Sequence, residues 1–89
     1  MVLHTINKSS AWIKCNGLIN ESDIVVLIED GVYLGLDRLI ELNMNNTFAL
    51  QADTVARGIV EKLPQSIRQI SYARFVNLTV TADKVCAWF

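Results

Sequence analysis

Short apolar runs alternate with helix-like patterns along the whole chain. Residues 2–6 predict a first strand, and 24–28, which read Ile-Val-Val-Leu-Ile, form a β-branched run without polar alternation. A strand that is apolar on both sides is buried on both faces, which is typical of a parallel sheet covered by helices. Further short strands are predicted over 47–50, 67–70 and 84–88.

A first helix is predicted between the first two strands. Ser9 or Ser10 is placed to cap it, and Trp12, Cys15 and Ile19 would share one of its faces at spacings of three and four.

The clearest helical pattern follows the second strand. Asp30 is placed to cap a helix that runs to about Leu42, with an apolar stripe at Val32, Leu36, Leu39 and Ile40.

Two shorter helical segments follow the third and fourth strands. A capped turn is expected from Asp53 to Gly58, with Gly58 as its left-handed terminator, and 72–81 shows helical spacing. The alternation of strands and helices predicts a single α/β domain over 1–89. Its open sheet would have about five strands, mostly parallel, with helices on both faces.

Composition and charge narrow the function classes. Apolar residues make up 52% of the 89 residues, so some apolar surface is expected outside the core and predicts association with a partner. The net charge is −1 and no basic stripe is present, which argues against direct nucleic-acid binding. No secretory signal and no apolar run of about 18 residues is visible, so we expect a soluble cytoplasmic protein without a membrane segment.

Candidate reactive groups are few. Cys15 and Cys86 lack C-x-x-C spacing, and both are expected to pack in apolar surroundings, although Cys15 could instead accept sulfur. His4 lies near the carboxyl end of the first strand, where ligand sites open in parallel sheets, but a lone histidine is more often structural. Glu29 and Asp30 form an acidic pair that helix capping explains. Phosphate-binding glycine patterns are absent, and no cofactor or metal is expected.

Three aromatic residues are candidate interface contacts. Tyr33, Trp88 and Phe89 belong to the residue types that supply much of the energy at protein interfaces. Ordinary core packing explains them equally well. The last strand is also a candidate exposed edge, which a partner could cover.

Five stretches of the chain together form a specific pattern, and they are 3–9 (LHTINKS), 27–33 (LIEDGVY), 53–58 (DTVARG), 70–78 (ISYARFVNL) and 87–88 (AW). In this order, and over nearly the whole length, they resemble the motifs of the TusB/DsrH family. The resemblance implies a DsrE/DsrF/DsrH-like fold. The region between the first stretch and the second strand is several residues shorter than in familiar members.

The resemblance also implies a function, that of a non-catalytic structural subunit of a TusBCD-like heterohexamer with TusC-like and TusD-like partners, the counterparts of DsrF and DsrE. In that relay, persulfide sulfur passes through the TusD-like subunit to TusE and a thiouridylase, which makes 2-thiouridine at the tRNA wobble position. The tRNA is then a pathway substrate and not a direct partner.

Two alternatives stay open. Cys15 falls where DsrH-type members can carry a cysteine, so the chain could be a sulfur-carrier subunit in a sulfur-oxidation relay. A free-standing, homo-oligomeric α/β protein that binds an anion is the second alternative, supported by fold analogy alone.

Overall fold

Five strands form one sheet in the computed structural model, which describes residues 1–37 and 46–89. They are β1 (Val2–Ile6), β2 (Ile24–Leu27), β3 (Thr47–Leu50), β4 (Arg68–Ile70) and β5 (Lys84–Trp88). The order across the sheet is β4-β3-β2-β1-β5, and every pairing is parallel. The predicted fold class is confirmed, and β5 is an edge strand as the sequence suggested.

The helical segments are mostly short. Between β1 and β2 lie η1 (Ser9–Ala11), α1 (Trp12–Cys15) and η2 (Asn16–Leu18), and β2 leads into the 3₁₀ helix η3 (Glu29–Leu36). The helix α2 (Gln51–Ala56) follows β3, and α3 (Tyr72–Thr81) joins β4 to β5.

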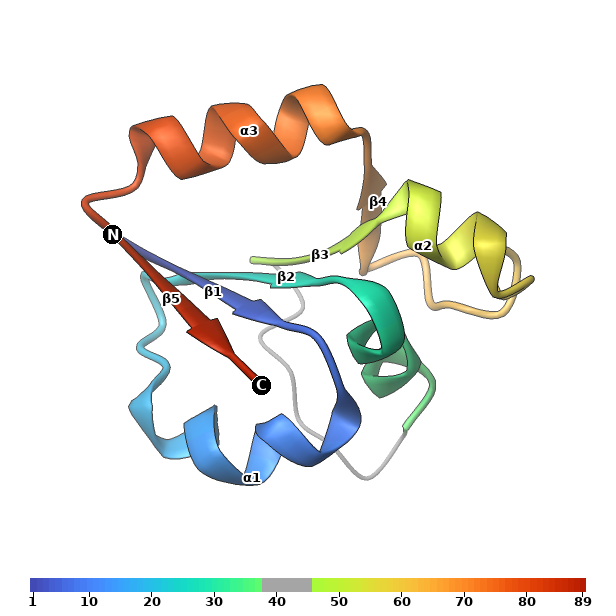
Figure 1. The fold of residues 1–89 in the computed structure, drawn as a ribbon, viewed down its shortest axis with the longest axis horizontal. Coiled ribbons are helices and arrows are strands. Elements are labelled where there is room, and N and C mark those ends of the chain that lie inside the picture. The colour runs from blue at the N-terminus through green and yellow to red at the C-terminus, as the bar shows by residue number, and fades with distance from the viewer. Residues whose placement is uncertain (38–45) are drawn as a thin grey trace.

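The sheet has an apolar cluster on each face. Ile6, Val25 and Leu27 point to the face on which Cys15 of α1 and Val32 of η3 pack, which we call the α1 face. On the opposite α3 face, Leu3, Val26 and Phe48 contact Leu78 and Phe75 of α3. Figure 1 shows α3 and α1 on opposite sides of the strands. The prediction that residues 24–28 are buried on both faces is therefore confirmed for the central strand β2.

The crossover through α3 explains why β5 lies beside β1. The chain steps from β1 to β4 in one direction with its connecting segments on the α1 face, so a right-handed return must cross the other face. The ten residues of α3 span about 15 Å. β4 and β5 lie on opposite edges of the sheet, four inter-strand distances apart, which is about 19 Å. A single helix with its short flanking turns therefore completes the connection.

Several predicted helix starts are wrong. Lys8, Ile28 and Leu50 occupy the N-cap positions of η1, η3 and α2, and none of these caps has a side-chain hydrogen bond. Ser9, Asp30 and Asp53 lie inside the helices that they were expected to cap, and Ser10 lies inside η1. Asp30 and Asp53 bind other groups instead, as described below. By contrast, Ser71 caps α3 by accepting a hydrogen bond from the backbone N–H of Arg74.

The long helix predicted after β2 is a 3₁₀ helix over Glu29–Leu36 in the structure. Its predicted continuation through Leu39, Ile40 and Leu42 lies outside the described residues. The other segments follow the prediction more closely. Trp12 and Ile19 pack against the cluster that contains Cys15, and Gly58 has a positive φ of 66° after α2.

Candidate functional site at the carboxyl edge of the sheet

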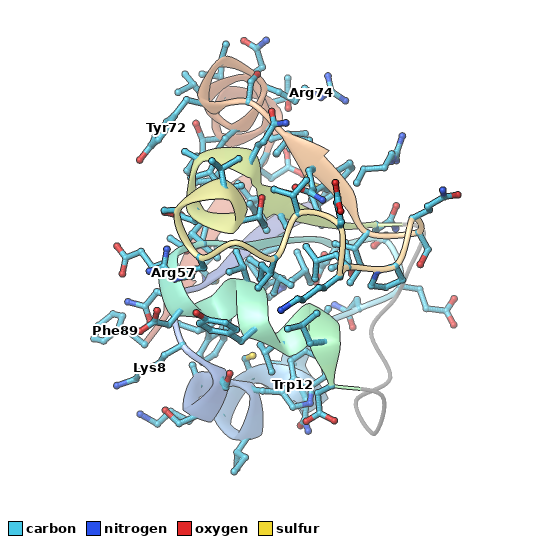
Figure 2. All side chains as sticks on the ribbon, turned by 90° about the vertical axis from the view of Figure 1, so that its right-hand side faces the viewer. Lys8, Trp12, Arg57, Tyr72, Arg74 and Phe89 are labelled. Carbon is cyan, nitrogen blue, oxygen red and sulfur yellow. The ribbon has the colours of Figure 1, made fainter. Side chains whose placement is uncertain are left out.

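Because all five strands are parallel, their carboxyl ends meet at one edge of the sheet. Residues of the sequence motifs follow β1, β2 and β3 at this edge. Figure 2 shows Lys8, Arg57 and Phe89 along one side of the molecule, although they come from segments that are far apart in the sequence. This edge is the place where ligand and partner sites open in α/β proteins.

His4 is held between two partners on the α1 face. Its Nε2 lies 2.9 Å from Oδ2 of Asp23, and the indole Nε1–H of Trp88 donates to its Nδ1 over 3.0 Å. An indole nitrogen can only donate, so Nδ1 accepts and the imidazole proton lies on Nε2. His4 is 3% exposed and both of its ring nitrogens are engaged. Its position therefore favours a structural role over a catalytic one.

Asp23 completes this network immediately before β2. Its carboxylate also accepts hydrogen bonds from the backbone N–H groups of Val2 (3.1 Å) and Asn20 (3.0 Å). Burial alone would raise the pKa of the Asp23 carboxyl, but these hydrogen bonds and the one from His4 outweigh it and hold the pKa below its usual value. The network thereby ties β1, the turn before β2 and the end of β5 together.

A second polar cluster joins the two acidic motifs at the carboxyl edge. Arg57 donates from Nε to Oδ1 of Asp30 over 2.8 Å, and its Nη1 lies 3.5 Å from Oδ1 of Asp53. The other oxygen of Asp53 accepts from the backbone N–H of Glu29 over 2.7 Å. Glu29 has a positive φ of 49°, so this hydrogen bond fixes an uncommon backbone conformation at the turn from β2 into η3.

Gly31 brings this turn against the end of β1. A Cβ added at Gly31 would lie 1.9 Å from the carbonyl oxygen of Ile6, so only glycine fits there. The Asp-Gly pair of the motif therefore has two separate roles. Asp30 binds Arg57, and Gly31 lets η3 approach the backbone of β1.

The two cysteines differ in accessibility. Cys15 is 0% exposed within the α1-face core, and burial raises the pKa of its thiol. A buried thiol with a raised pKa is a poor nucleophile. Cys86 is half-buried on β5, opposite His4 in the β1–β5 register. Both cysteines are predicted from the sequence to be buried. Cys15 is buried, but Cys86 is only half-buried and is the more accessible of the two.

The three candidate interface aromatics belong to segments that begin or end at the carboxyl edge, η3 after β2 and the end of β5. Tyr33 lies on η3 and is 41% exposed, and Phe89 is 68% exposed just after β5. The Phe89 carbonyl accepts a hydrogen bond from Nζ of Lys14 over 3.2 Å. Trp88 is half-buried, and its rings stack beside His4 at a centroid distance of 6.2 Å. Trp88 packs partly against the α1-face cluster, and Tyr33 and Phe89 are the more exposed of the three. A role of these aromatics at an interface stays a prediction.

Two residues of these networks were not singled out from the sequence. Asp23 has no motif around it, and its only signal is a carboxylate directly before a strand that is apolar on both sides. Arg57 stood within the DTVARG stretch, whose acidic partner Asp30 belongs to a different stretch. Their pairing depends on the sheet topology, which periodicity does not specify.

A pocket, a metal site and a membrane-spanning helix are further candidate features of the described part of the chain. A depression of about 640 Å³ beside β4 is lined by Phe48, Arg68 and Arg74, among others, and by none of the candidate residues Cys15, Tyr33, Trp88 and Phe89. Within residues 1–37 and 46–89, no group of His, Cys, Asp or Glu side chains is arranged to hold a metal ion. No helix in these ranges is both long and apolar enough to cross a membrane.

These features define an α/β protein with an all-parallel five-stranded sheet, in which motif residues form polar clusters that join neighbouring strands. A family model described as DsrH-like protein matches residues 7–85. Two proteins named Protein TusB, from Shigella dysenteriae serotype 1 (strain Sd197) and Escherichia coli O81 (strain ED1a), are each 33% identical to it. Both alignments extend over 96 residues and cover 98% of this chain and 100% of the relative. The chain therefore belongs to the TusB/DsrH family.

Proposed function

We propose that this protein is a non-catalytic structural subunit of a TusBCD-like sulfur-relay complex in the cytoplasm. Its partners would be TusC-like and TusD-like subunits, the counterparts of DsrF and DsrE. The complex would pass persulfide sulfur by way of TusE and a thiouridylase toward 2-thiouridine at the tRNA wobble position. In this proposal the chain contacts neither the tRNA nor a cofactor, and the sulfur transfer takes place on the TusD-like partner.

The observation that carries the proposal is the way in which the motif residues are used. His4, Asp30 and Arg57 all belong to stretches shared with the family, and each binds another residue of this chain. His4 is 3% exposed with both ring nitrogens bonded, and Arg57 and Asp30 bind each other, so the contacts of these side chains join segments of the chain. The motifs therefore support a scaffold that presents the carboxyl edge of its sheet to other subunits.

The state of Cys15 argues against the sulfur-carrier alternative. A persulfide carrier must reach the sulfur of a donor protein, and its thiolate must form readily. Cys15 is fully buried and burial raises its pKa. We therefore assign Cys15 to the core, and we leave the sulfur-carrying cysteine to a partner subunit.

The experiment is capture of the tagged full-length chain from its own cells, followed by mass spectrometry of the intact subunits without reductant, before and after loading by a cysteine desulfurase. We expect TusC-like and TusD-like subunits in the complex, with the mass of one added sulfur atom on the TusD-like subunit alone. Added sulfur on Cys15 would establish the carrier alternative. Capture of neither partner would overturn the proposed function.

Matched surface variants test whether the carboxyl edge is the contact. We expect Tyr33→Ser and Phe89→Ser to reduce capture of the partners. Val80→Ser is the control, because Val80 is 77% exposed but lies near the end of α3, where the chain turns toward the amino end of β5. Loss of capture with Val80→Ser alone would move the contact away from the carboxyl edge.

A further inference from the structure

The two edges of the sheet differ in how well they are guarded against pairing with another strand. β4 has only three residues, and short length is one of the usual protections of an edge strand. Both edge strands begin with a basic residue, Arg68 in β4 and Lys84 in β5. β5 has five residues, however, and its stretch from Val85 to Trp88 carries no charge. In Figure 1 no other ribbon passes in front of β5, and no described residue pairs with its outer side.

The hydrogen bonds of β5 to β1 show which backbone groups are left over. The N–H of Asn7 donates to the carbonyl of Trp88, so Trp88 directs its backbone groups toward β1. Successive residues of a strand direct these groups to opposite sides, so Lys84 and Cys86 also face β1. Val85 and Ala87 therefore direct their N–H and C=O groups outward, where they form a short unpaired template.

From this arrangement we propose that β5 pairs in antiparallel orientation with β5 of a second copy of this chain, about a two-fold axis at Cys86. In that register Val85 lies opposite Ala87 of the second copy, and Ala87 lies opposite its Val85. Both pairs consist of outward-facing residues, so each can exchange two backbone hydrogen bonds. The two sheets would join into one continuous sheet across the axis. This inference concerns the chain by itself and does not depend on the proposed function.

The side chains of β5 are complementary to themselves in the same register. On the α3 face, the larger Val85, which is 45% exposed, meets the small Ala87 of the second copy. On the α1 face, Lys84 lies opposite Trp88 of the second copy, where its stem can cover the half-buried indole. An interface in which each patch matches its own copy is what a two-fold dimer requires, and such a dimer closes without forming fibres. A net charge of −1 opposes this association only weakly.

The first test measures the mass of the purified chain in solution by sedimentation equilibrium over a range of concentrations. We expect a dimer for the unmodified chain, and an increase of at least about tenfold in the dimer dissociation constant for Ala87→Lys, since lysine is a natural guard of edge strands. Val80→Lys is the control, because Val80 is 77% exposed but lies on α3, and it should dimerise normally.

A second variant removes the backbone donor instead of adding charge. Val85→Pro eliminates an N–H that faces away from β1, so the sheet within the chain should stay intact while the dimer weakens. Circular dichroism would check that each variant is folded. A chain that is monomeric at every concentration, even if β5 is covered in a complex with other subunits, would overturn the proposal. A dimer that resists both Ala87→Lys and Val85→Pro would do the same.

Disulfide trapping tests the register. Opposed residues of a non-hydrogen-bonded antiparallel pair have Cα atoms about 4.5 Å apart, within the range that a disulfide spans. We therefore expect Cys86 of two copies to join when oxidised glutathione accepts their two electrons and two protons, with Cys15 left unlinked. In a Cys86→Ser background, Val85→Cys alone should not cross-link, but Val85→Cys together with Ala87→Cys should. Strong cross-linking of Val85→Cys alone would place the axis elsewhere and overturn this register.

Discussion

The carboxylate of Asp23 is the acceptor on which several buried donors depend. Replacing it with alanine leaves His4 Nε2 and the backbone N–H groups of Val2 and Asn20 without their partner. Each unsatisfied buried donor costs about 1–3 kcal/mol, partly relieved where water enters. We expect Asp23→Ala to lower the free energy of unfolding by about 3 kcal/mol in urea denaturation. Asp23→Asn is the control, because one amide oxygen still accepts, and it should lose clearly less.

The lowered pKa of Asp23 also predicts how stability depends on pH. A carboxyl whose pKa is lower in the folded protein than in the unfolded chain stabilises the fold above its unfolded pKa, which is about 3.9. That contribution is lost as the pH falls from about 5 through the folded pKa. We therefore expect the free energy of unfolding to drop over this acid range, and to drop less in Asp23→Asn. Parallel curves for the two proteins would show that Asp23 is not the titrating group.

Residue types in the sequence revealed part of this network. His4 is a candidate from the sequence because it is the only histidine and lies near the end of a predicted strand. Its partners are 19 residues and 84 residues away, and neither distance has a periodic signature. The sheet order, with β5 beside β1, is what brings Trp88 to His4. A sequence reading that predicts elements without their order cannot place this contact.

The contact between η3 and β1 depends on one glycine. A Cβ at Gly31 would overlap the backbone of Ile6, and backbone atoms cannot move aside as a flexible side chain can. We expect Gly31→Ala to lower the free energy of unfolding by about 3 kcal/mol or more, measured by urea denaturation. Gly17→Ala is the matched control, since nothing lies within 4 Å of a Cβ added there. It should change stability by less than about 0.5 kcal/mol. Equal effects at both positions would contradict the packing argument.

The strands were easier to predict than the helix starts, for a physical reason. β2, β3 and β5 each contain at least three consecutive apolar residues, which mark these strands in the sequence without knowledge of their neighbours. The segment after β2 has helical periodicity, but Gly31 and Gly35 lie close to other segments, and a Cβ at Gly35 would be 2.6 Å from Leu63. This close approach coincides with the tighter 3₁₀ geometry. The sequence predicts that the Asp30 side chain caps the N-terminus of its own helix. In the folded protein it accepts a hydrogen bond from Arg57 instead.

The accessibility of Cys15 connects the whole fold with the proposed function. Cys15 lies in the cluster that also contains residues of β1, β2, β3 and η3, so exposing it requires much of the molecule to open. We expect maleimide to label Cys15 in the folded protein at least about 10³-fold more slowly than in the unfolded chain.

Cys86 in the same molecule is the internal control. It is half-buried on an edge strand. At protein concentrations at which the chain is monomeric it should therefore react without global unfolding, and the two sites can be followed separately by peptide mass spectrometry. Low concentrations of urea should accelerate labelling of Cys15 with the same denaturant dependence as global unfolding, and leave Cys86 little changed. If Cys15 reacted as fast as Cys86 without urea, a local opening would expose its thiol. Cys15 would then be accessible enough to accept sulfur, and this result would support the sulfur-carrier alternative.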